Sequence, residues 1–154
     1  MIGCIVTGHG EFAAGLASAL AMIAGEQEHF EAVPFRETEP LDAFAGRMKA
    51  ALQRLLEQTD GVLVFTDLMG GTPFRTAMLA AAGHGNVAVL TGTNLPMLIE
   101  IGLMRAAESD VHALARTAEE AGRAGLQLAR LEPGGPAARP GGAEAGEDDD
   151  SEGI

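Results

Sequence analysis

Short apolar runs alternate with longer amphipathic segments along most of this chain, and that alternation constrains the fold more than any other feature. Residues 2–7 (IGCIVT) and 61–66 (GVLVFT) are continuous apolar runs of strand length. Residues 41–56 repeat large apolar side chains every three or four positions, as one face of a helix does. Continuously apolar strands alternating with helices are typical of a parallel sheet covered on both faces. We therefore predict an α/β fold with a mainly parallel, doubly wound, four-stranded sheet.

The same patterns predict where each element lies. Strands are expected at residues 2–7, 30–35, 61–66 and 87–91, and helices at residues 12–24, 41–56, 73–82, 95–107 and 111–124. Pro34 cannot donate a backbone hydrogen bond, which favours an edge position for the second strand. Periodicity leaves residues 126–131 open between a continuation of the last helix and a short final strand.

The composition changes at Glu132. Residues 132–154 consist mainly of Pro, Gly, Ala and acidic residues, and such a segment buries too little apolar surface to offset its chain entropy. We therefore predict one domain over residues 1–131, followed by a disordered acidic tail over residues 132–154. The formal net charge of the chain is -12, which disfavours nucleic acid and anionic membranes as partners.

Cysteine count and apolar run lengths limit the class of protein further. Cys4 is the only cysteine, which excludes a disulfide framework and a four-cysteine zinc site, and its apolar setting predicts a buried side chain. No apolar run approaches the roughly 20 residues that a membrane-spanning helix needs. No basic segment precedes an apolar stretch, so we expect a cytoplasmic protein.

Ligands of doubly wound sheets bind beyond the carboxyl ends of the strands, so the loops at that edge carry the chemistry. His9 follows the first strand between two glycines, and Asp67 follows the third strand. A neutral imidazole is a good nucleophile near neutral pH, and Asp67 could hold the proton of one ring nitrogen while the other attacks. The alternative is that His9 only bonds to backbone and that Asp67 is a turn or cap residue.

The loop after Asp67 continues as Gly70, Gly71 and Thr72 ahead of Pro73. Thr72 suits a helix N-cap and Pro73 the first helical position, and the glycines allow a ligand to approach the backbone. The free amides of such a helix start, with the Thr72 hydroxyl, predict an anion site. An ordinary loop and cap is the alternative. The loop lacks the lysine of a nucleotide-binding P-loop.

Other polar residues near these loops have simpler roles. Asn94 is expected to cap the helix that follows it. Thr7 and Thr66 end strands beside the site, where they either add hydroxyls or satisfy backbone groups. Arg75 is the nearest cation on the site face and either meets an anion or is solvated. The remaining histidines are expected on the solvated surface, and they are His29, His84 and His112.

Four segments, in order and spacing, resemble the mannose-type IIA proteins of the bacterial sugar phosphotransferase system (PTS). They are residues 5–10 (IVTGHG), 20–27 (LAMIAGEQ), 66–74 (TDLMGGTPF) and 92–98 (GTNLPML). The resemblance covers residues 1 to about 130. It implies a phosphotransferase with a phosphohistidine intermediate at His9 and with no cofactor or metal.

The resemblance also implies partners and roles. His9 would accept the phosphoryl group of phospho-HPr and pass it to a IIB protein, which serves sugar uptake through membrane IIC and IID subunits. Asp67 would orient the imidazole, and Gly70, Gly71 and Thr72 would receive the phosphoryl group. Family members are homodimers that exchange an antiparallel C-terminal strand, which would be residues 126–131 here.

The resemblance leaves a choice of system. Because the chain stops in an acidic tail, IIB is expected to be a separate protein. Thr72, Arg75 and Thr93 favour an N-acetylgalactosamine or galactosamine system, with mannose as the other choice. The alternatives are a phosphocarrier for a dihydroxyacetone kinase, whose loop resembles Ser-His-Ser rather than Gly-His-Gly, and a regulatory PTS protein without transport. A small hydrolase is disfavoured because no Gly-x-Ser-x-Gly sequence occurs.

Overall fold

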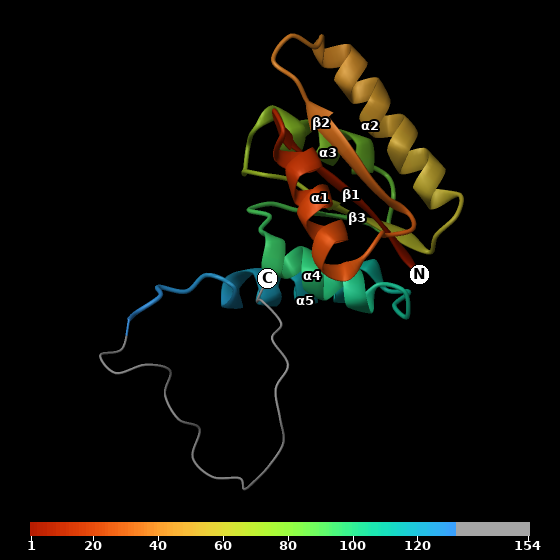
Figure 1. The fold of residues 1–154 in the computed structure, drawn as a ribbon. Coiled ribbons are helices and arrows are strands. Elements are labelled where there is room, and N and C mark those ends of the chain that lie inside the picture. Colours follow the sequence, from red (N-terminus) through yellow and green to blue (C-terminus); the bar gives the residue numbers. More distant parts are fainter. Residues whose placement is uncertain (132–154) are drawn as a thin grey trace, which may run out of the picture.

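The computed structural model describes residues 1–131, in which strands and helices alternate from the N-terminus (Figure 1). The strands are β1 (Ile2–His9), β2 (Phe30–Phe35), β3 (Gly61–Phe65) and β4 (Val87–Leu90). The helices are α1 (Phe12–Ala24), α2 (Leu41–Leu56), α3 (Thr72–Ala81), α4 (Leu95–Met104) and α5 (Val111–Ala124). The tail predicted at residues 132–154 lies outside the described residues, so its disorder and the domain boundary stay predictions.

All four strands are parallel, in the order β2-β1-β3-β4. β1 pairs with β2 on one side, where His9 lies opposite Phe35, and with β3 on the other, where Val6 lies opposite Phe65. The chain thus leaves β1 towards one edge and then returns to add β3 on the other side, which is the switch point of doubly wound sheets. The predicted sheet is confirmed, and β2 lies at an edge as Pro34 indicates.

Helices cover both faces of the sheet, with α1, α4 and α5 on one face and α2 and α3 on the other (Figure 1). Each face therefore has its own hydrophobic core. Successive side chains of a strand point to opposite faces, so Cys4 and Val6 pack in the core under α1, α4 and α5, while Ile5 packs in the core under α2 and α3. Phe44 and Met48 of the predicted α2 stripe are fully buried, and such burial stabilises the fold by about 1.5–3 kcal/mol per side chain. None of the helices formed by residues 1–131 is long and apolar enough to cross a membrane.

The first strand is longer than its apolar run indicates. β1 continues to His9 instead of ending at Thr7, because its pairing with β2 extends through Gly8 and His9 after its pairing with β3 has ended at Val6. His9 is therefore the last residue of a strand and not a member of a free loop. Its backbone is fixed by the sheet, which restricts where its side chain can point.

Two buried residues, Cys4 and Arg105, lie near the N-terminal end of β1. Cys4 is fully buried, as predicted, and burial raises the pKa of its thiol to about 12, so the thiol stays protonated and unreactive. Arg105, just beyond α4, is also buried, and its guanidinium donates hydrogen bonds to the carbonyl oxygens of Ile2 and Glu28. These bonds tie the end of α4 to the start of β1, and the sequence did not predict them.

Residues 126–131 form neither helix nor strand in the single chain. Leu126, Leu128 and Leu131 are all exposed. The sheet formed by the described residues consists of parallel strands and includes no antiparallel one. The exchanged C-terminal strand therefore stays a prediction.

Candidate functional site

His9 lies at the carboxyl end of β1, where the chain turns away from the sheet into α1. Gly10 makes this turn with φ of 59°, a conformation that favours glycine, and its N–H donates to the Phe35 carbonyl oxygen at 2.8 Å. Gly8 is buried, and a Cβ there would lie 2.5 Å from the Phe12 ring, so only glycine fits before His9. The His9 side chain is 48% exposed, which leaves part of the imidazole open to a partner.

The carboxylate of Asp67 binds the ring of His9. Asp67 follows β3, its side chain is only 10% exposed, and Oδ2 lies 2.6 Å from His9 Nδ1. The same oxygen accepts the backbone N–H of His9 at 2.9 Å, and Oδ1 accepts the N–H of Leu68 at 2.8 Å. A carboxylate only accepts hydrogen bonds, so Nδ1 carries the proton and Nε2 keeps its lone pair. The structure thus brings together the two residues that the sequence paired.

The environment keeps Asp67 ionised. Partial burial favours the neutral acid, but hydrogen bonds from the His9 amide, the His9 ring and the Leu68 amide outweigh it and hold the pKa of Asp67 below its ordinary value. An ionised Asp67 can stabilise positive charge that develops on the imidazole when Nε2 forms a new bond. This electrostatic support suits a nucleophilic or phosphoryl-accepting histidine.

The start of α3 faces the ring of His9. A Cβ on Gly71 would lie 3.1 Å from His9 Cε1, so the absence of a side chain at Gly71 lets the ring and backbone meet. The edge of the imidazole that carries Cε1, the atom between the two ring nitrogens, therefore faces this backbone. Gly70, with φ of 79°, makes the turn that leads into the helix.

The predicted capping of α3 is wrong by one position. Gly71, and not Thr72, is the N-cap, because the first helical hydrogen bond runs from the Arg75 N–H to the Gly71 oxygen at 3.0 Å and Gly71 is extended. Thr72 is therefore the first helical residue, and Pro73 the second. The amides of a first helical turn have no partner within the helix, and because Pro73 has no N–H, those of Thr72 and Phe74 are the ones that can meet an anion near the His9 ring.

Most other predicted site neighbours have structural roles. The hydroxyl of Thr7 donates to the Val33 carbonyl oxygen at 2.6 Å and that of Thr66 to the Leu90 oxygen at 3.1 Å, so both satisfy backbone groups of a neighbouring strand. Asn94 caps α4 as predicted by accepting the Met97 N–H at 3.2 Å, and its own amide donates to the Gly122 oxygen at 2.8 Å.

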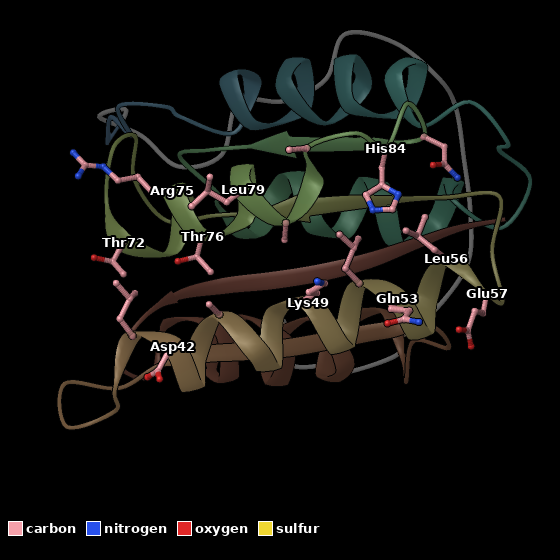
Figure 2. Close-up of a pocket in the computed structure, with 16 residues that line it drawn as sticks. Asp42, Lys49, Gln53, Leu56, Glu57, Thr72, Arg75, Thr76, Leu79 and His84 are labelled. Carbon is pink, nitrogen blue, oxygen red and sulfur yellow. The ribbon is translucent and has the colours of Figure 1, made fainter.

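Arg75 lines the end of a groove of about 1320 Å³ between α2 and α3, and Figure 2 shows its guanidinium extending outwards at the end where Thr72 also lies. The groove runs from this end of the sheet to His84 and Glu57 at the other. Arg75 is exposed, and it forms no ion pair with any residue in the described part of the chain. It is a solvated cation at the mouth of the groove.

The remaining histidines differ from one another. His84 and His112 are exposed as predicted, and Nε2 of His112 lies 2.9 Å from the Gly85 oxygen. His29 is half-buried with φ of 53°, so the prediction that it is a solvated residue is wrong. It sits in the tight turn that enters β2. Residues 1–131 contain no group of three or more His, Cys, Asp or Glu side chains that could hold a metal.

An aromatic contact that the sequence did not predict completes the surroundings of His9. The ring of Phe35, at the end of β2, meets the imidazole edge to face, with centroids 5.8 Å apart and planes at 83°. Phe35 comes next to His9 only through strand pairing, so nothing in the sequence alone marks the contact. The imidazole thus has Asp67 at one nitrogen, Gly71 near Cε1 and Phe35 against the ring.

Comparison with known proteins decides the family. The model of the family described as "PTS system fructose IIA component" matches residues 3–119. The chain belongs to this family. It is 34% identical over 105 residues to the PTS system fructose-specific EIIA component of Bacillus subtilis, covering 68% of this chain and 71% of that protein. The family is the mannose-type family of the sequence resemblance, which is confirmed.

Further relatives agree with the PTS IIA assignment. The PTS system mannose-specific EIIAB component of Escherichia coli K12 is 31% identical over 132 residues, and the chain spans 86% of its own length but 41% of that protein. A solved EIIA structure from Streptococcus agalactiae superposes with a TM-score of 0.73 at 32% identity, covering 83% of this chain and 97% of that one. A mannose/sorbose-specific IIA subunit from Enterococcus faecalis superposes with a TM-score of 0.76 at 27% identity, covering 85% of this chain and 96% of that one.

Proposed function

We propose that His9 is the phosphorylated residue of this PTS IIA protein, accepting the phosphoryl group of phospho-HPr and passing it to a IIB protein. The observation that carries the proposal is the 2.6 Å hydrogen bond between His9 Nδ1 and Asp67, beside the start of α3. It supports a proton on Nδ1 and a free Nε2, on a side chain that is 48% exposed. PTS IIA components work with HPr and IIB proteins, which supports both the donor and the acceptor.

The proposed step transfers the phosphoryl group between two imidazoles. The lone pair of His9 Nε2 forms a bond to phosphorus while the bond from phosphorus to the donor histidine breaks, and that electron pair returns to the donor ring. The proton on Nδ1 stays in its bond to Asp67, whose negative charge stabilises the positive charge developing on the His9 ring. Transfer to IIB is the same step in reverse, with His9 as the donor.

The start of α3 would receive the phosphoryl oxygens. Their negative charge would be met by the free amides of the first helical turn, by the positive end of the helix dipole and by the Thr72 hydroxyl. The lack of side chains at Gly70 and Gly71 lets the phosphoryl group approach the backbone closely. Such a transfer depends on positioning and charge stabilisation, which these groups supply together with Asp67.

We also propose a homodimer built on residues 126–131. Among residues 1–131 no strand pairs with the outer edge of β4, and this edge lines a groove of about 610 Å³ with Val87, Leu90 and the flanking α3 and α5. An exposed alternating segment, with Leu126 and Leu128 two residues apart, fits such an edge as an added strand. Light scattering should give the mass of a dimer, and Leu128→Asp should shift it towards the monomer. A monomeric unaltered protein would contradict this.

PTS IIC and IID subunits would complete the route to the sugar in the membrane. The IIA protein would act upstream of them, through IIB. It would carry phosphoryl groups without touching the sugar, so the identity of the sugar would depend on the membrane subunits.

Labelling tests the proposed site. Incubation with phosphoenolpyruvate, enzyme I and HPr should place an acid-labile, base-stable phosphate on the chain. His9→Ala should abolish the label, and His84→Ala, which removes an exposed histidine in another part of the fold, should keep it. Labelling of the His9 variant would disprove the assignment. No labelling of the unaltered chain would disprove the phosphocarrier function itself.

A further inference from the structure

The hydrogen bond to Asp67 fixes one atom of the His9 ring but not its plane. Small coupled rotations about the two side-chain torsions of His9 can still tilt the ring while the bond from Nδ1 to Oδ2 is kept, and 48% of the side chain faces solvent. Transfer needs the attacking atom within about 3–3.5 Å of phosphorus and in line with the leaving group. A second contact that limits this tilt would therefore favour transfer.

Phe35 makes that contact. It lies directly opposite His9 in the pairing of β1 with β2, and its carbonyl oxygen accepts the N–H of Gly10, so the backbones of the two strand ends are fixed together. The two rings are 5.8 Å apart at 83°, which is the edge-to-face arrangement that aromatic pairs prefer. Tilting the imidazole would break this arrangement.

The Phe35 ring is itself held from behind. It packs on the fully buried ring of Phe44, with centroids 4.9 Å apart. The guanidinium of Arg47 lies over Phe44 at 5.7 Å, donates to the Pro34 carbonyl oxygen at 2.6 Å and pairs with Glu39 at 2.6 Å. A ring fixed by a buried neighbour and by its own strand can serve as a rigid support.

We propose that Phe35 is a positioning residue for phosphoryl transfer: its ring holds the plane of the His9 imidazole so that Nε2 stays aimed at the incoming phosphorus. The proposal rests on the proposed role of His9. Asp67 then sets which nitrogen carries the proton, and Phe35 sets the direction in which the other nitrogen points. The effect of Phe35 is on the transfer step and not on the strength of partner binding.

The test compares Phe35→Leu with variants that separate orientation from packing. Phe35→Met fills similar space without a ring, Phe35→Tyr keeps the ring, and Phe30→Leu removes the phenyl group at the other end of β2, away from His9. Single-turnover transfer from radiolabelled phospho-HPr is followed against HPr concentration. NMR records the His9 ring proton shifts and which nitrogen is protonated.

Both Phe35→Leu and Phe35→Met should transfer roughly tenfold more slowly at saturating HPr, with the half-saturating concentration little changed. Phe35→Tyr should restore the rate, and Phe30→Leu should not alter it. The His9 ring shifts should change in the ringless variants while the proton stays on Nδ1. Unchanged transfer by a folded ringless variant, or a rise in the half-saturating concentration alone, would overturn the proposal. An unaltered chain that takes no label would instead refute the proposed function.

Discussion

Asp67→Asn tests the charge and hydrogen-bonding capacity of the carboxylate separately from its size. Asparagine has nearly the same size but carries one acceptor oxygen and one NH2 group. Asp67 accepts three hydrogen bonds, from the His9 ring at 2.6 Å, the His9 amide at 2.9 Å and the Leu68 amide at 2.8 Å. If the asparagine oxygen faces Leu68, the NH2 group donates to His9 Nδ1. The ring proton then moves to Nε2 and blocks the attacking lone pair.

The hydrogen bonds set the magnitude of this effect. A hydrogen bond to a charged group contributes about 1.5–3 kcal/mol, which corresponds to a rate loss of about 10- to 150-fold if it acts in the transition state. With the NH2 group facing Nδ1, the wrong tautomer adds to this, and the equivalent change in the serine protease triad lowers kcat about 10⁴-fold. We therefore expect Asp67→Asn to slow phosphoryl transfer by roughly 10² to 10⁴-fold.

Rapid-quench measurement of transfer from phospho-HPr gives the rate, and nitrogen-15 NMR of the histidine ring gives the tautomer. The control is Asp42→Asn, which removes an exposed carboxylate at the start of α2 and should leave both readouts unchanged. If Asp67→Asn transfers at the normal rate, or slows while its ring proton stays on Nδ1, the reasoning from the hydrogen bonds fails.

Two further changes test the same site. Gly71→Ala places a Cβ 3.1 Å from His9 Cε1, so the ring must shift, and transfer should slow about tenfold while the melting temperature changes little; Gly46→Ala, with open space around its Cβ, is the matched control. The lowered pKa of Asp67 stabilises the fold above its ordinary value of 3.8, and this stability is lost as the pH falls through the lowered pKa. The free energy of unfolding, measured with urea, should therefore fall below about pH 4, and it should fall less steeply in Asp67→Asn. An equal dependence of this free energy on pH in the two proteins would contradict the reasoning.

The sheet and the pairing of His9 with Asp67 follow from local signals in the sequence. Apolar runs mark the strands, and polar residues at their carboxyl ends meet because parallel strands end at one edge. The pair of His9 and Asp67 was therefore predictable, while the exact end of β1 was not. That end depends on pairing between Gly8 and Pro34 across the sheet, which no local pattern specifies.

Long-range contacts account for what the sequence missed. Phe35 contacts His9 and Arg105 contacts Ile2 only in the folded chain. A phenylalanine or an arginine can take many other roles, so the residue type does not predict either contact. His29 adopts a positive φ in its turn, and a histidine in the sequence does not by itself predict that conformation. Residues 126–131 are a different case, because a strand that pairs with a second copy has no partner within one chain.

The most direct measurement of the central claim is NMR of the phosphorylated chain with nitrogen-15 labelled histidine. Coupling between phosphorus-31 and a ring nitrogen identifies the atom that carries the phosphoryl group. The hydrogen bond from Nδ1 to Asp67 predicts coupling to Nε2 of His9, with Nδ1 still protonated. Coupling to Nδ1 of His9, or to another histidine, would contradict it.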